Sequence, residues 1–66
     1  MAKLIAFAGI NDETVWINPG TVAMVEQEGD HAVVFFAGAD VPSVFLKGDA
    51  DSVAAKLNKN MGWWWS

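Results

Sequence analysis

The chain has 66 residues, of which 53% are hydrophobic, and its formal net charge is −4. It contains no cysteine and a single histidine, which excludes disulfides, thiolate zinc sites and a histidine-rich metal centre. All four basic residues are lysines in an acidic chain, so it is a poor candidate for binding nucleic-acid phosphates.

A chain of this length forms one domain with a small interior, and small domains are usually stabilised by disulfides, metals or partner chains. Its hydrophobic fraction lies above the roughly 45–50% that is usual for soluble domains. We therefore expect part of the apolar surface to lie at an interface, with self-association as the common aid that remains. We expect residues 1–62 to form a single β-rich domain and residues 63–66 to form a tryptophan-rich tail.

Residues 1–9 combine a lysine, an apolar run and an Ala-Phe-Ala triplet, as secretion signals do, but the run has only about half the usual length. No segment approaches the roughly 20 apolar residues that a membrane helix needs. We therefore expect a first strand here, no membrane span, and a cytoplasmic or otherwise reducing location.

Turn-forming residues recur at short, even intervals, and the runs between them are rich in Val, Ile, Phe and Trp. This rhythm is typical of a meander of short strands. Pro19 and Gly20 separate the second run from the third, and a compact hairpin around Gly29 joins the third to the fourth. The predicted strands are residues 3–8, 14–17, 21–27, 31–37 and 43–47.

The alternation of side chains is informative in the third and fourth runs. In the third run, Val22, Met24 and Glu26 are predicted to share one face. In the fourth, residues 31–37, neither face is polar, because Val33 and Phe35 alternate with other apolar residues. A strand that is apolar on both sides is usually covered on both sides. One helix can cover one face, and a second chain is the simplest cover for the other.

A helix is predicted to begin near Asp49, whose carboxylate can accept hydrogen bonds from the first-turn amides. Apolar residues then recur at helical spacing up to Met61, and Gly62 is placed as a stop. We expect the sheet and this helix to enclose one core. Its predicted members are Ile5, Phe7, Val15, Ile17, Val22, Val25, Val34, Phe36, Phe45, Val53 and Leu57.

Three consecutive indoles, Trp63, Trp64 and Trp65, give the tail a large apolar area, because each can bury about 150–250 Å². Two readings carry equal weight. The tail packs back on its own domain, or it docks into a neighbouring subunit or partner, where Trp is a favoured anchor. Membrane-surface contact or base stacking is a minor alternative.

Other chemistry-bearing residues have simpler readings. His31 opens a strand after a turn and is accompanied by no recognisable Ser or Cys nucleophile. Acidic residues cluster around the hairpin (Glu26, Glu28 and Asp30) and at the helix start, where Asp49-Ala50-Asp51-Ser52 lacks the Gly and the terminal Glu of a calcium loop. Solvated turns and helix capping account for them. We therefore expect no catalytic residue, no metal site and no cofactor.

One stretch resembles a known family. An apolar–Asn–Pro step at residues 15–19 leads into the strand Val22-Ala23-Met24-Val25-Glu26, followed by a hairpin, further strands and a short helix. This pattern, over about residues 14–57, resembles the small FlbD-type proteins of flagellar operons and implies a similar fold. Gly20 stands where that family typically has an acidic residue, so no functional residue is carried over. A looser similarity runs to ring-forming β-rich regulators such as the tryptophan RNA-binding attenuation protein.

The sequence thus predicts a β-rich α+β fold: a small antiparallel sheet or open barrel of four to five strands with one C-terminal helix. The predicted function is a non-enzymatic assembly module, a homo-oligomer whose interface uses Val33, Phe35, Trp63, Trp64 and Trp65. The alternative is a small regulatory adaptor that binds another protein through the same surface, in a phage or motility context. A third reading, an enzyme subunit completed across an interface, would use His31 or the hairpin carboxylates.

Overall fold

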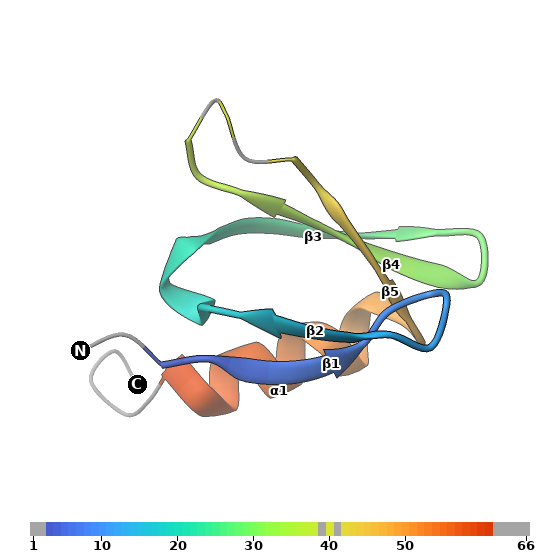
Figure 1. Ribbon diagram of the computed structural model, residues 1–66, viewed down its shortest axis with the longest axis horizontal. Coiled ribbons are helices and arrows are strands. Elements are labelled where there is room, and N and C mark those ends of the chain that lie inside the picture. The colour runs from blue at the N-terminus through green and yellow to red at the C-terminus, as the bar shows by residue number, and fades with distance from the viewer. Residues whose placement is uncertain (1–2, 39, 41, 62–66) are drawn as a thin grey trace.

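The computed structural model describes residues 3–38, 40 and 42–61. Five strands and a 3₁₀ turn precede a single helix at the end of the described chain (Figure 1). The strands are β1 (Ile5–Ala8), β2 (Thr14–Ile17), β3 (Val22–Glu28), β4 (His31–Phe36) and β5 (Val44–Lys47), and the helix is α1 (Ala50–Met61). All five predicted strands and the predicted helix are present, with ends that differ by two residues at most.

β1 and β2 form a two-stranded antiparallel sheet in which Ile5 pairs with Ile17 and Phe7 with Val15. The turn between these strands is held by a hydrogen bond of 2.7 Å from the Gly9 amide to the Glu13 carbonyl. A Cβ atom on Gly9 would meet the flexible end of the Glu13 side chain, whose Oε1 accepts a hydrogen bond from the Asn11 amide, so a larger residue here would displace that carboxylate.

β3, β4 and β5 form a three-stranded antiparallel sheet with β4 in the centre. The β3–β4 hairpin turns at Gly29, whose φ of 59° lies in the left-handed region that glycine adopts readily. A bulge between Val22 and Met24 leaves Ala23 without a partner in β4. Because a bulge shifts the alternation by one residue, Val22 joins Val25 on the core face. The expectation that Val22 and Met24 share a face was wrong for this reason.

The two sheets meet at one short seam. Gly9 forms an isolated antiparallel bridge with Leu46, and the Ile10 amide donates a hydrogen bond of 3.3 Å to the Phe45 carbonyl. The fold is therefore a sheet-rich α+β arrangement of two antiparallel sheets and not a closed barrel. This confirms the predicted fold class.

α1 begins as the sequence predicts. The Asp49 side chain accepts a hydrogen bond from the Ser52 amide, and the Ala50 amide donates one of 2.7 Å to Oε1 of Gln27 on β3. At the other side of the helix, Lys56 donates to the Ala6 carbonyl. These contacts fix α1 between β3 and β1, over the core face of the sheets (Figure 1). Nowhere in the described part of the chain is a helix both long and apolar enough to cross a membrane.

The core lies between α1 and the inner faces of the two sheets. Its buried cluster comprises Ile5, Phe7, Ile17, Ala32, Val34, Leu46, Val53 and Leu57. Four further predicted core residues, Val15, Val22, Val25 and Phe36, are partly buried against it. The prediction for Phe45 was wrong: its side chain is 42% exposed, and Leu46 is the fully buried residue of β5. The register of β5 explains this, because Leu46 pairs with Ala32, which faces the core.

Candidate functional site

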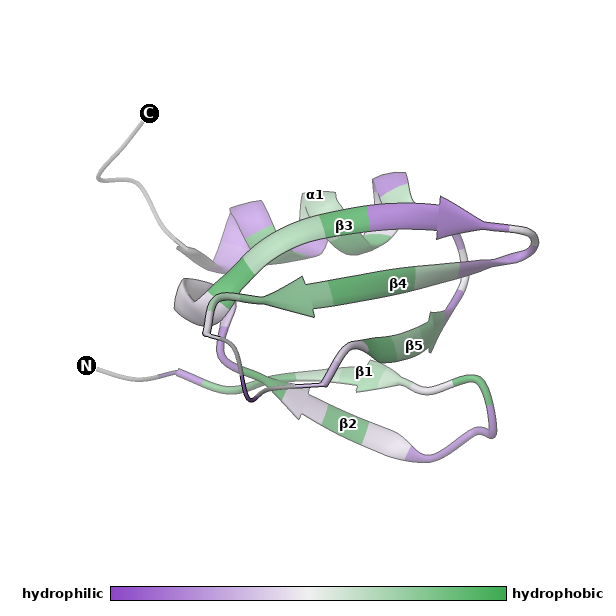
Figure 2. Cartoon of the chain, turned by 90° about the horizontal axis from the view of Figure 1, so that it is seen from above, coloured by the Kyte–Doolittle hydropathy of each residue, from purple (hydrophilic) through white to green (hydrophobic). Residues whose placement is uncertain are grey.

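The face of the three-stranded sheet that points away from α1, here called the outer face, has two rows of mainly apolar side chains. In the first, Met24 pairs with Phe35. In the second, Val33 on the central strand lies between Glu26 of β3 and Phe45 of β5. Figure 2 shows the hydrophobic colour of β4 and β5, against a polar second half of β3. The outer face is therefore apolar across its centre and acidic along one edge.

Exposure differs sharply among these side chains. Met24 is 47% exposed and Phe45 is 42% exposed, whereas Phe35 is half-buried and Val33 is buried. α1 packs on the opposite face of the sheet, and Val33 is nevertheless only 2% exposed between Glu26 and Phe45. The apolar side chains that the outer face presents to solvent are thus Met24, Phe35 and Phe45, on one side of Val33 and Glu26. Single exposed hydrophobic residues are ordinary in folded proteins, but Met24 and Phe45 are exposed on the same sheet face beside half-buried Phe35, which favours a contact surface.

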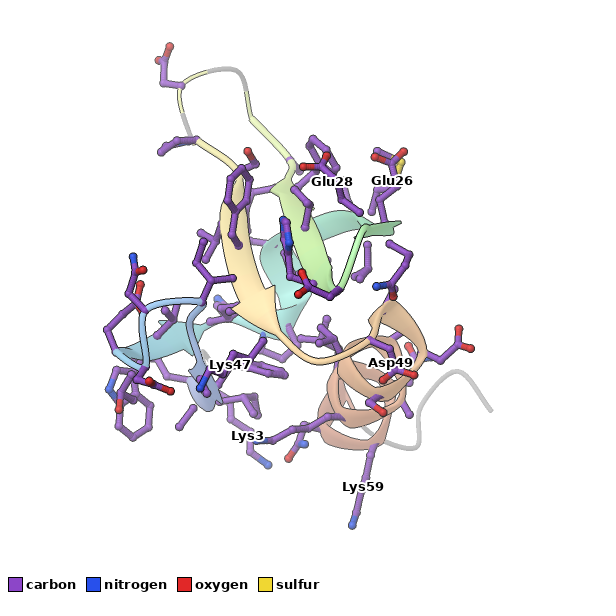
Figure 3. The ribbon with its side chains drawn as sticks, turned by 90° about the vertical axis from the view of Figure 1, so that its right-hand side faces the viewer. Lys3, Glu26, Glu28, Lys47, Asp49 and Lys59 are labelled. Atoms are coloured by element: carbon purple, nitrogen blue, oxygen red, sulfur yellow. The ribbon has the colours of Figure 1, made fainter. Side chains whose placement is uncertain are left out.

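A polar row closes one end of the outer face, where Glu28, His31 and Lys47 lie side by side on β3, β4 and β5. The His31 ring packs against that of Phe45, with 5.3 Å between the centroids. Its Nε2 lies 3.7 Å from Oε1 of Glu28, and its Nδ1 lies 3.5 Å from Oδ1 of Asp30. Figure 3 shows Glu26 and Glu28 on the side of the sheet away from α1. This row can give polar contacts at the rim of an apolar interface.

Lys47 links this row to the other sheet through an ion pair with Asp12, in the turn between β1 and β2. Asp12 adopts a left-handed conformation with φ of 66°, which short polar side chains tolerate. A hollow of about 270 Å³ beside the pair is lined by Ile10, Asp30, His31, Lys47 and Gly48. Both members of the pair are largely exposed, so it contributes little to stability.

His31 and the hairpin carboxylates are the residues that the enzyme-subunit alternative would use. His31 has Glu28 and Asp30 as neighbours, but its Nε2 makes no hydrogen bond to any described residue. The Thr21 hydroxyl donates to the Asn18 carbonyl and not to the His31 ring, whereas an activated nucleophile needs a hydrogen bond to its base. Among the described residues, no group of three His, Asp or Glu side chains is placed to hold a metal ion.

One titrating group outside this face has a resolved shift. Hydrogen bonds from Ser52, first from its side chain and then from its backbone, hold the pKa of Asp49 below its ordinary value. Asp49 is solvent-exposed at the start of α1 (Figure 3). Its carboxylate therefore acts as the helix cap that the sequence predicts.

A second depression runs between the open edge of β3 and the helix and is mainly apolar. It is here called the β3–α1 groove. It has a volume of about 260 Å³. Its lining residues are Pro19, Val22, Ala23, Met24, Val25, Ala54, Leu57 and Asn58. Met24 therefore belongs both to this groove and to the outer face.

The structure brings together the two predicted interface residues that it describes, since Val33 and Phe35 both lie on the outer face. Trp63, Trp64 and Trp65 lie outside the described residues. Sequence reasoning missed Met24 and Phe45 as members of this face. The bulge at Ala23 concealed Met24, whereas the alternation of β4 carried to its neighbour β5 would have placed Phe45 opposite Val33.

Comparison with protein-family models, with curated proteins and with solved structures found no match to this chain. The resemblance to FlbD-type proteins therefore stays a prediction.

Proposed function

We propose that this protein is a non-enzymatic assembly module that self-associates through the outer face of the β3–β4–β5 sheet. The observation that supports the proposal most strongly is the group of apolar side chains, Met24, Phe35 and Phe45, that this face presents to solvent. The opposite face of the same sheet already packs on α1, so the outer face is the one that a partner can cover.

A second copy fits this face because the same surface offers both an apolar centre and polar groups of both signs. In a two-fold arrangement each copy presents an identical patch to the other. The apolar side chains on the outer faces of the two copies would then pack together, with the two β3–β4–β5 sheets about 10 Å apart, as stacked sheets are. The end row of Glu28, His31 and Lys47 would form a polar rim, in which a lysine of one copy can approach a carboxylate of the other.

The area of such a contact sets its expected strength. Three strands of four to seven residues offer less surface than the roughly 800 Å² per partner of a standard stable interface. We therefore expect reversible association in the micromolar range or weaker, visible as a rise of average mass with protein concentration.

The test is sedimentation velocity or light scattering of the full chain over a concentration series, with Phe45→Lys as the test variant. A charge at this position should shift the association to at least tenfold higher concentration, because it would be desolvated in the contact. Trp16→Lys is the matched control. Trp16 is also an exposed aromatic residue, 62% exposed, but it lies on the other sheet.

Self-association through this face requires the wild-type chain and Trp16→Lys to associate alike, while Phe45→Lys associates only at concentrations at least tenfold higher. A wild-type chain that remains a monomer at every concentration rejects the proposal. In that case recovery of one stoichiometric protein partner, lost on Phe45→Lys, would support the adaptor alternative instead.

A further inference from the structure

The β3–α1 groove differs from the outer face in shape and in its surroundings. It lies along the edge of β3 that has no strand partner among the described residues, and residues of α1 line its other side. Its volume of about 260 Å³ is below the roughly 300–1,000 Å³ of small-molecule pockets. An apolar depression of this size suits one large side chain better than a cofactor.

We propose that the β3–α1 groove is the docking site of the chain's own segment that follows α1, with the Trp63 indole as the inserted side chain. The inference goes beyond the proposed function, since it concerns a single chain and holds whether or not two copies associate.

The position of the helix end places this segment within reach. α1 ends at Met61, and the groove is lined by Asn58, Leu57 and Ala54 of its second half. At about 1.5 Å of rise per residue, Asn58 lies only about 4.5 Å before the helix end. Two residues beyond the helix span up to about 7 Å when extended. Trp63 can therefore return to the level of Asn58 and Leu57 without unwinding the helix.

Gly62, which lies between α1 and Trp63, favours such a return of the chain toward the groove. Gly62 follows the last helical residue directly, where glycine commonly ends a helix by adopting a left-handed conformation. In this type of helix end, the residue after the glycine packs on side chains five and six positions earlier. In this chain the residue after the glycine is Trp63. The side chains five and six positions before it are Asn58 and Leu57, which both line the groove.

The chemistry of the groove matches an indole. One wall is formed by Pro19 of the 3₁₀ turn and by aliphatic side chains of β3, among them the polarisable Met24, which makes favourable contacts with aromatic rings. The Asn58 amide oxygen can accept a hydrogen bond from the indole N–H, the one polar group that a buried tryptophan must satisfy. Tryptophan also has the largest apolar area to gain by leaving water.

The test is NMR of the full chain with labelled alanine methyl groups, in the Phe45→Lys background so that self-association does not interfere. Ala23 and Ala54 line the groove from opposite walls. An indole between them should shift both methyl signals upfield, and Trp63→Ala should abolish that shift. Trp65→Ala is the matched control and should leave both signals close to their original positions.

Docking within one chain predicts that the shifts are independent of protein concentration. If Trp63→Ala leaves both methyl signals unchanged, the proposal is wrong. Shifts that disappear on dilution would also overturn it, because the indole would then come from a second copy. Neither result bears on the outer face, whose role is decided separately by the sedimentation of Phe45→Lys and Trp16→Lys.

Discussion

Two neighbouring residues of β5 occupy opposite environments, and both are large and hydrophobic. Leu46 is fully buried in the core, whereas Phe45 is 42% exposed on the outer face beside His31. A strand places successive side chains on opposite faces, so one of the two must point away from the core. Composition alone does not decide which one does.

This difference predicts the energetics of truncation. Leu46→Ala should lower the free energy of unfolding by about 2–5 kcal/mol, since it removes buried methyl groups and leaves a cavity. Phe45→Ala should cost about 1 kcal/mol or less, because its ring is already partly hydrated. Urea unfolding of both variants, at a concentration where the chain is monomeric, measures the two losses. Equal losses would show that the assignment of the two faces of β5 is wrong.

At the scale of elements, the sequence predicted those boundaries that depend on local chemistry. The bounds of β2 agree with the prediction, and α1 begins directly after Asp49 because a carboxylate there satisfies first-turn amides. The facing of β3 was not predictable, since the bulge at Ala23 depends on its pairing with β4. The β3–α1 groove was not predictable either, because it arises only from how the helix packs beside that edge strand.

The cap at Asp49 predicts a pH dependence of stability. Its pKa is lowered in the folded chain from the ordinary value of 3.8 by its hydrogen bonds to Ser52. A depressed folded-state pKa gives stability that is fully present above 3.8 and is lost as pH falls through the lower folded value. Asp49→Ala should therefore be less stable than wild type near pH 7, and the gap should narrow in acid.

Denaturant unfolding between pH 2 and 7 checks this, with Asp40→Ala as the control. Asp40 is exposed in the β4–β5 connection and lies away from the helix start. A gap for Asp49→Ala that stays constant down to the lowest pH would mean that the carboxylate charge does not stabilise α1.

At the scale of the whole molecule, charge opposes the proposed association. Each chain carries a formal charge of −4, and Glu26 and Glu28 lie on the outer face itself. Two copies that approach through this face therefore repel one another at long range. Apolar contact at short range has to overcome that repulsion, so the balance depends on ionic strength.

We therefore expect added salt to strengthen self-association. Raising ionic strength from about 0.01 M to 0.15 M shortens the screening length from about 30 Å to about 8 Å. The average mass at fixed protein concentration should rise accordingly in sedimentation equilibrium. Sodium chloride is the suitable salt, because sulfate would also strengthen apolar contacts directly. A decrease of mass with salt would indicate that ion pairs between copies, and not apolar contacts, hold the assembly.

The hydrogen bond from Lys56 to the Ala6 carbonyl joins segments 50 residues apart, and beside it Ile5 and Phe7 pack in one cluster with Val53 and Leu57. During synthesis the strands leave the ribosome first, and their hydrophobic inner faces stay exposed until the twelve residues of α1 have followed. Only then can the interior close, so a nascent chain of this protein depends on its helix before it can resist aggregation or proteolysis.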